Sequence, residues 1–145
     1  MMSNWSEGGT AQKPMPYPYY VDIVTKQYFD GVDNKNLAQV LDTFTDDAVL
    51  TEVTSSTVHT GKKEISAMFE KLFADFSDIW HGNFVHTADP DSNTICSQFT
   101  VLITPKGSED ELRYENCNRF YLKDDKFHRV YVYMSGDNLL IEGEA

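Results

Sequence analysis

Two polar side chains stand in stretches whose other inward positions are apolar, and both belong to types that can do acid–base chemistry. Tyr28 shares a helical spacing with three valines of its stretch, so its hydroxyl is expected to face the interior. Glu52 shares strand parity with Leu50, so its carboxylate is expected to face the same interior. The alternatives are that Tyr28 only fills the core and that Glu52 pairs with a cation or lies at an open cavity mouth.

The position expected for Glu52 is the stronger of the two signals. Placing a carboxylate toward a core is unfavourable unless the charge is paired. In apolar surroundings its pKa would rise, and a raised pKa suits a general base near neutral pH. We therefore interpret Glu52 as the candidate base and Tyr28 as a candidate hydrogen-bond donor.

Two further candidates come from the C-terminal half of the chain. Asn118 shares strand parity with Asn116, while the alternate positions of the same stretch, from Arg113 to Tyr121, are expected on the exterior face. An inward amide can donate to a developing oxyanion, although the two amides could equally satisfy each other or buried backbone. His81 is placed on a predicted strand with Asn83 and Val85 on its face, and a hydrogen-bonded structural histidine is the more common reading of such a residue.

The sequence gives little indication of a metal site, a phosphate-binding loop or a nucleophilic serine or cysteine. A metal site from Glu52 and the histidines at 59, 81 and 86 would lack a recognised ligand spacing. The chain carries no glycine-rich phosphate loop and no GxSxG motif, so no metal and no cofactor is predicted. Cys96 and Cys117 are expected to be reduced structural thiols, and a disulfide would require that their strands be neighbours.

Hydrophobic periodicity and turn residues predict the helices and strands that carry these side chains. A polar tail over 1–16 precedes a single domain over 17–140. Three helices interleaved with two short strands, then four longer antiparallel strands, predict an α+β fold in which a curved sheet wraps the long helix and leaves a cone-shaped cavity. The second helix is expected to bury Phe44 and to end at Thr45–Asp47. The predicted helices are about 18–33, 36–44 and 62–75, and the predicted strands are 48–53, 57–60, 78–87, 94–103, 111–122 and 127–135.

Length and charge exclude several classes of partner. A chain of 145 residues suits one domain with one sizeable core. A net charge of −11 repels phosphate backbones and anionic lipid, so neither nucleic acid nor a membrane is an expected partner. The N-terminal stretch has neither the basic start nor the apolar run of a secretory signal, and a cytoplasmic location is expected.

The stretch YFDGVDNKNLAQVLDTFTDDAVLTEV, over 28–53, together with HTGKKEI at the start of the third predicted helix, resembles the nuclear transport factor 2-like superfamily. The similarity is greatest to its SnoaL-like and ketosteroid isomerase-like branch. That resemblance implies a tyrosine donor at Tyr28, a carboxylate base at Glu52 and a second polar group at Asn118. Ketosteroid isomerases have aspartate at the second position and an acid at the third, so steroid isomerisation is not the expected reaction. Scytalone dehydratase, another member, uses cavity histidines, and this resemblance makes His81 a further candidate.

The function predicted from these observations is a small-molecule cavity protein. The first hypothesis is a cofactor-free isomerase, cyclase or dehydratase that acts by general acid–base catalysis on a small apolar, polyketide- or terpenoid-like molecule. The alternatives are a ligand-binding protein without turnover and a dimeric interaction protein of the same fold. Both faces of the last predicted strand are partly apolar, so a homodimer through the outer sheet face is also expected.

Overall fold

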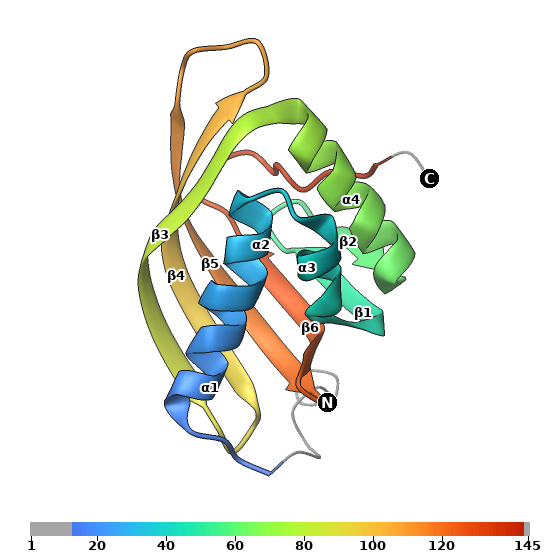
Figure 1. Cartoon of the computed structure of the whole chain (residues 1–145), viewed down its shortest axis with the longest axis vertical. Helices are drawn as coiled ribbons and strands as arrows, with labels where there is room; N and C mark the ends of the chain where they lie inside the picture. Colours follow the sequence, from blue (N-terminus) through green and yellow to red (C-terminus); the bar gives the residue numbers. More distant parts are fainter. Residues whose placement is uncertain (1–12, 144–145) are drawn as a thin grey trace.

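The computed structural model describes residues 13–143 and shows one curved sheet packed against helices on its concave side (Figure 1). The strand order is β2-β1-β6-β5-β4-β3; β1 pairs parallel with β6, and the other neighbours are antiparallel. The predicted α+β cone fold is therefore confirmed. The strands are β1 (Phe44–Glu52), β2 (Thr57–Thr60), β3 (Phe76–Asp89), β4 (Thr94–Pro105), β5 (Leu112–Lys123) and β6 (Lys126–Tyr133).

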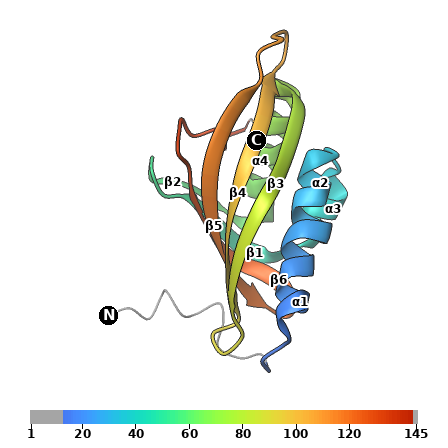
Figure 2. The same ribbon diagram turned by 90° about the vertical axis from the view of Figure 1, so that its left-hand side faces the viewer.

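One long N-terminal helix crosses the concave face of the sheet. It runs through α1 (Tyr17–Asp22), a π-helical stretch η3 (Ile23–Phe29) and α2 (Asp30–Asp33) without a break. Pro18 lies in its first turn, where a missing N–H leaves no carbonyl unpaired. Figure 2 shows this helix and α3 on one side of strands β3–β5. None of the helices in the described part of the chain is long and apolar enough to cross a membrane.

Two shorter helices complete the helical layer on the concave side of the sheet. The side chain of Asn36 accepts a hydrogen bond from the backbone N–H of Gln39, as the predicted N-cap requires, and starts α3 (Leu37–Asp42). Gly61 has a φ of +83° and turns the chain from β2 into α4 (Gly61–Asp75). The buried face of α4 carries Ile65, Met68, Phe69 and Leu72, the apolar face that the periodicity indicated.

The second helix ends earlier than predicted, and Phe44 belongs to strand β1. The hydroxyl of Thr43 donates to the carbonyl of Val40 at 2.6 Å and closes α3, while Phe127 N–H donates to the carbonyl of Thr43 at 2.7 Å. Phe44 then pairs with Phe127, so it is fully buried in the sheet instead of on the helix. The polar turn residues Thr45–Asp47 consequently lie within the strand, in an irregular section that separates two paired segments.

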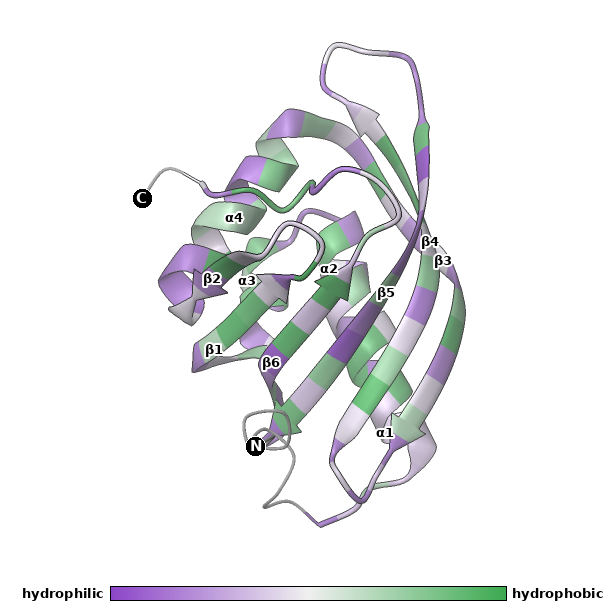
Figure 3. Ribbon diagram, turned by 180° about the vertical axis from the view of Figure 1, so that it is seen from behind, coloured by the Kyte–Doolittle hydropathy of each residue, from purple (hydrophilic) through white to green (hydrophobic). Residues whose placement is uncertain are grey.

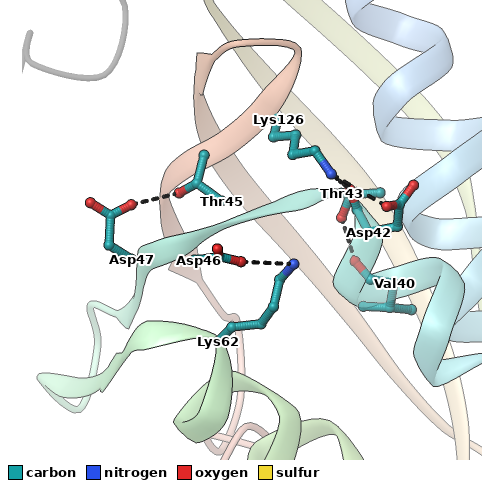
Figure 4. Close-up of polar contacts among 8 residues, drawn as sticks. All are labelled: Val40, Asp42, Thr43, Thr45, Asp46, Asp47, Lys62 and Lys126. Carbon is teal, nitrogen blue, oxygen red and sulfur yellow. Dashed lines mark hydrogen bonds and ion pairs between the residues drawn. The ribbon is translucent and has the colours of Figure 1, made fainter.

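Side-chain contacts from neighbouring elements hold this irregular section (Figure 4). Thr45 donates to Asp47 at 3.0 Å, and Lys62 at the start of α4 lies 3.5 Å from the carboxylate of Asp46. Lys126 donates to both the backbone and the side chain of Asp42. These ion pairs are exposed, so they help to position the irregular section of β1 but contribute little to the free energy of unfolding.

A bulge in β3 changes which residues face the core. The pairing with β4 shifts between Gly82 and Val85, and Asn83 adopts a left-handed φ of +54°. Val85 is 61% exposed, whereas Phe84 packs against the core. The expectation that Asn83 and Val85 share the face of His81 was therefore wrong, because parity does not carry across an extra residue.

The two faces of the sheet differ in their surroundings. Inward residues of β4, β5 and β6 such as Ile95, Phe120 and Val130 are buried under the helices. Figure 3, which shows the sheet from behind, colours β4, β5 and β6 in alternating hydrophilic and hydrophobic residues, as expected when successive side chains point to opposite faces of the sheet. The concave face therefore supplies the core and the walls of the candidate site.

Candidate functional site

An apolar cavity opens between the N-terminal helix, α4 and the concave face of the sheet. Its volume is about 40 Å³, below the about 300–1,000 Å³ of typical small-molecule pockets, so a ring-sized ligand requires the side chains of its walls to move apart. Its walls are mostly apolar with a few polar groups, which is typical of ligand pockets. The polar residues among its walls are Tyr28, His81, Asn116 and Asn118.

His81 is held in this wall by a carboxylate from the end of the N-terminal helix. The two oxygens of Asp33 contact different groups of His81: Oδ1 lies 2.5 Å from ring Nδ1, and Oδ2 accepts from the backbone N–H at 2.9 Å. The ring packs on Phe29 with centroids 4.4 Å apart. The side chains of His81 and Asp33 are 10% and 22% exposed, so the pair lies at the margin of the cavity.

The contacts with Asp33 fix the orientation of the His81 ring and place the ring hydrogen on Nδ1. With Nδ1–H donating to Asp33, the other nitrogen of His81, Nε2, carries the free lone pair and can accept a proton. The carboxylate then stabilises the imidazolium that forms. The pair is therefore arranged as a general acid–base group.

Asp33 was not among the residues singled out from the sequence. The sequence did contain a signal for Asp33, because a carboxylate in the last turn of a helix interacts unfavourably with the helix dipole. Such a residue is more easily explained by a partner in another element than by the helix itself. What the sequence does not provide is the position of β3, 48 residues later.

The two inward asparagines have different surroundings. Asn116 is structural, because its side-chain oxygen accepts from the backbone N–H of Ser135 at 3.2 Å. Asn118 is 3% exposed, and within residues 13–143 its Oδ1 has no hydrogen-bond partner. A buried amide oxygen without a partner is unfavourable by about 1–3 kcal/mol, and here it belongs to a residue that lines the cavity.

Tyr28 is buried in the cavity wall among aromatic rings. Its ring makes edge contacts with Phe29, Phe44, Phe69, Phe120 and Phe127. Burial raises the pKa of the Tyr28 hydroxyl well above its usual value, so the group remains a protonated donor across the physiological range. The inward orientation predicted for Tyr28 is what the structure shows.

Glu52 is fully buried, as predicted, but it is not among the described residues that line the cavity. Its carboxylate accepts from the hydroxyl of Thr54 at 2.7 Å and from the backbone N–H and hydroxyl of Ser55 at 2.8 and 2.7 Å. Burial acts to raise the pKa of Glu52, but the hydrogen bonds from Thr54 and Ser55 outweigh it and hold the pKa below its usual value. The expected raised pKa was wrong, because three donors in the turn after β1 satisfy the carboxylate.

The C-terminal segment 136–143, which we call the strap, closes one side of the cavity. Leu139 and Leu140 of the strap line it. Asn138 donates to the hydroxyl of Ser55 at 3.1 Å, and His59 Nε2 lies 3.0 Å from the carbonyl of Leu140. Ser55 therefore links Glu52 to the strap, and this role was not evident from the sequence.

His86 has structural partners outside the cavity. Its Nδ1 lies 2.8 Å from the hydroxyl of Ser97, its ring stacks on Phe84, and burial lowers its pKa. It is half-buried on the edge strand β3, after the bulge. In the part of the chain that the structure describes, no three His, Cys, Asp or Glu residues lie together in a way that could hold a metal ion.

A comparison with family models identifies the family of this chain. The SnoaL-like domain model matches residues 25–130, which contain the second half of the N-terminal helix, the pair of Asp33 and His81, and most of the sheet. This chain belongs to the SnoaL-like family. A search among curated proteins found no match.

Solved structures agree on the fold of this SnoaL-like domain. A protein proposed to be a polyketide cyclase from a Silicibacter species is similar over 90% of this chain and 99% of its own, with 17% identity and a TM-score of 0.72. An LEH-like epoxide hydrolase of M. tuberculosis is similar over 81% and 84% of the two chains, with 13% identity and a TM-score of 0.69. A Catenulispora acidiphila protein with a ketosteroid isomerase-like fold, solved with trimethylamine, covers 77% and 84% at 12% identity and a TM-score of 0.69. At these identities the likeness concerns the fold alone.

Proposed function

We propose that the cavity is the active site of a cofactor-free enzyme that isomerises, cyclises or dehydrates a small apolar molecule by general acid–base catalysis. The observation that carries the proposal is the contact of His81 with Asp33 in the wall of an apolar cavity that is also lined by Asn118, whose buried Oδ1 has no hydrogen-bond partner within residues 13–143. The fold neighbours, which include proteins proposed to be polyketide cyclases, support the same class of small-molecule chemistry.

In this proposal His81 moves the proton. Its Nε2 removes a proton from carbon or oxygen of the substrate, and Asp33 stabilises the resulting imidazolium. The same nitrogen then returns the proton at a new position, or to a leaving hydroxyl when water is lost. The predicted base Glu52 has no part in this step, because it lies in a satisfied turn outside the cavity.

Asn118 and Tyr28 orient the polar end of the substrate. The amide of Asn118 can pair with a hydroxyl through Oδ1 or with a carbonyl through its N–H groups. The protonated hydroxyl of Tyr28 donates to an oxygen on which charge develops. Aromatic and aliphatic walls bind the rest, so the substrate is a compact ring compound with one or two oxygen functions.

Incubation of the pure protein with a metabolite extract tests this proposal. Mass spectrometry should show one compound consumed and a product of equal mass or of one water less. The matched variants are His81→Gln, which removes the base, and His86→Gln, which changes a histidine on the same strand that does not line the cavity. Turnover by His86→Gln but not by His81→Gln is expected, and equal turnover by both would overturn the proposal.

The alternative of binding without turnover is favoured by one observation. With Glu52 outside the cavity, the pair of His81 and Asp33 is the one acid–base group among its described walls. A compound that co-purifies with the protein, survives native mass spectrometry and is never converted would establish this alternative.

A further inference from the structure

Two thiols lie together on the outer face of the sheet. Cys96 on β4 and Cys117 on β5 are both free and half-buried, and their sulfur atoms are 3.4 Å apart. The strands that carry them are antiparallel neighbours, with Cys96 opposite Arg119 and Cys117 opposite Gln98. The thiols are therefore diagonal neighbours on one face, and the condition that the sequence left open for a disulfide is met.

We propose that Cys96 and Cys117 form a redox-active dithiol, which low-molecular-weight disulfides of the glutathione type oxidise reversibly to an intramolecular disulfide. The site is independent of the cavity, because it lies on the opposite face of the sheet. Its two sulfurs approach to 3.4 Å without any change of backbone, so closure to a bond of about 2.05 Å requires side-chain rotation and a small adjustment of the strands.

The chemistry balances as two thiol–disulfide exchanges. The thiolate of the first cysteine attacks one sulfur of oxidised glutathione, forms a mixed disulfide and releases one glutathione thiolate. The thiolate of the second cysteine then attacks the protein sulfur of that mixed disulfide and releases the second glutathione. The two protons of the protein thiols end on the two glutathione thiols, and no other oxidant is needed.

Burial and the hydrogen bond with Cys96 raise the pKa of Cys117 to about 11, so the thiolate of Cys117 is scarce at neutral pH and its exchange is slow. Either cysteine can be the first to attack, because the sulfur of the other lies close enough to resolve the mixed disulfide. A diagonal bond across two strands departs from relaxed disulfide geometry, and strained or exposed disulfides are the readily reduced ones.

A glutathione titration of the native protein tests the proposal. The full chain is equilibrated at neutral pH with millimolar glutathione at graded ratios of the reduced and oxidised forms. It is then quenched in acid, unfolded and alkylated. Intact mass distinguishes the open dithiol with two alkyl groups, the mixed disulfide with one glutathione, and the closed disulfide with neither.

The expected result is a closed form that exceeds the mixed disulfide by at least about tenfold, because a neighbouring thiol acts at an effective concentration above that of the glutathione. Addition of excess reduced glutathione should return the closed form to the dithiol with the near-ultraviolet circular dichroism unchanged. Cys117→Ser should stop at the mixed disulfide on Cys96. Accumulation of the mixed disulfide in the unaltered protein, or two alkyl groups at every ratio, would overturn the proposal.

Discussion

At the scale of single residues, two buried polar side chains that strand parity places on the same kind of inward position differ in their hydrogen bonds. Glu52 and Asn118 both face inward and are both nearly inaccessible. Glu52 has three donors within 2.8 Å, whereas Oδ1 of Asn118 has none within residues 13–143. The first is therefore a stabilising group and the second a candidate for recognition. The donors to Glu52 come from two residues of the turn that follows, Thr54 and Ser55, a local detail that periodicity does not contain.

Glu52→Gln should destabilise the protein. A glutamine amide nitrogen cannot accept from the hydroxyls or N–H that now bind the carboxylate, so a loss of about 1.5–3 kcal/mol is expected in the free energy of unfolding near neutral pH. Because the folded-state pKa is lowered, the stabilisation is complete above the unfolded pKa of about 4.3. It is lost as pH falls through the lower pKa of the folded protein. Urea unfolding at several pH values measures this, and a variant as stable as the parent at pH 7 would contradict it.

Asn118→Leu should raise stability and lower function. Replacing a buried amide whose Oδ1 has no hydrogen-bond partner within residues 13–143 with an apolar side chain of similar size removes the cost of burying that oxygen, and we expect the free energy of unfolding to rise by about 1 kcal/mol. The change also removes the amide N–H groups proposed to donate to an oxyanion, so turnover should fall by about 10²–10³-fold. Asn116→Leu is the control, because it breaks the hydrogen bond to Ser135 and should destabilise. If both variants are destabilised alike, Asn118 is structural.

At the scale of elements, the order and type of helices and strands followed from periodicity, but their junctions did not. Phe44 was predicted on a helix because its spacing from Val40 is helical, yet pairing with Phe127 places it in β1. The bulge after Gly82 likewise inverts the facing of Val85. Both errors arise where tertiary pairing overrides a local period. The strap over 136–143 has no periodic signal, because its position depends on Ser55 and His59.

Asn138→Ala should loosen the strap and widen access to the cavity. The change removes the hydrogen bonds to Ser55 and to the N–H of Leu140, and Leu139 and Leu140 would cover the cavity less tightly. Apolar probes such as small fluorescent naphthalene sulfonates should then associate faster, with the melting temperature lowered by no more than a few degrees. Stopped-flow fluorescence checks this. Unchanged association rates would show that the strap is not the entrance.

At the scale of the whole molecule, none of the helices within residues 13–143 packs on the outer face of strands β3–β5 (Figure 2). It carries Tyr121, which is buried in a T-shaped contact with Tyr131, and Tyr133, which is 43% exposed. Aromatic side chains of this kind are enriched in protein interfaces. The homodimer expected from the sequence remains a prediction for this face.

Association through this face should depend on salt. Each chain carries a net charge of −11, and screening reduces the repulsion between two such chains. Light scattering at micromolar concentration should show a mass near twice 16.6 kDa, with a weaker dimer at low ionic strength. Tyr133→Glu should favour the monomer, and Tyr17→Glu, which changes an exposed aromatic residue of the N-terminal helix on the other side of the sheet, should not. A 16.6 kDa species at every concentration and ionic strength would contradict the prediction.

In the proposed mechanism His81, held by Asp33, moves a proton in the cavity. This role is tested by the turnover number of His81→Gln, Asp33→Asn and His86→Gln with the compound that the unaltered protein converts. We expect a loss of about 10²–10⁴-fold for His81→Gln, a large loss for Asp33→Asn because the imidazolium is no longer stabilised, and activity near that of the parent for His86→Gln. Turnover by His81→Gln within a few-fold of the parent protein would show that His81 does not move the proton.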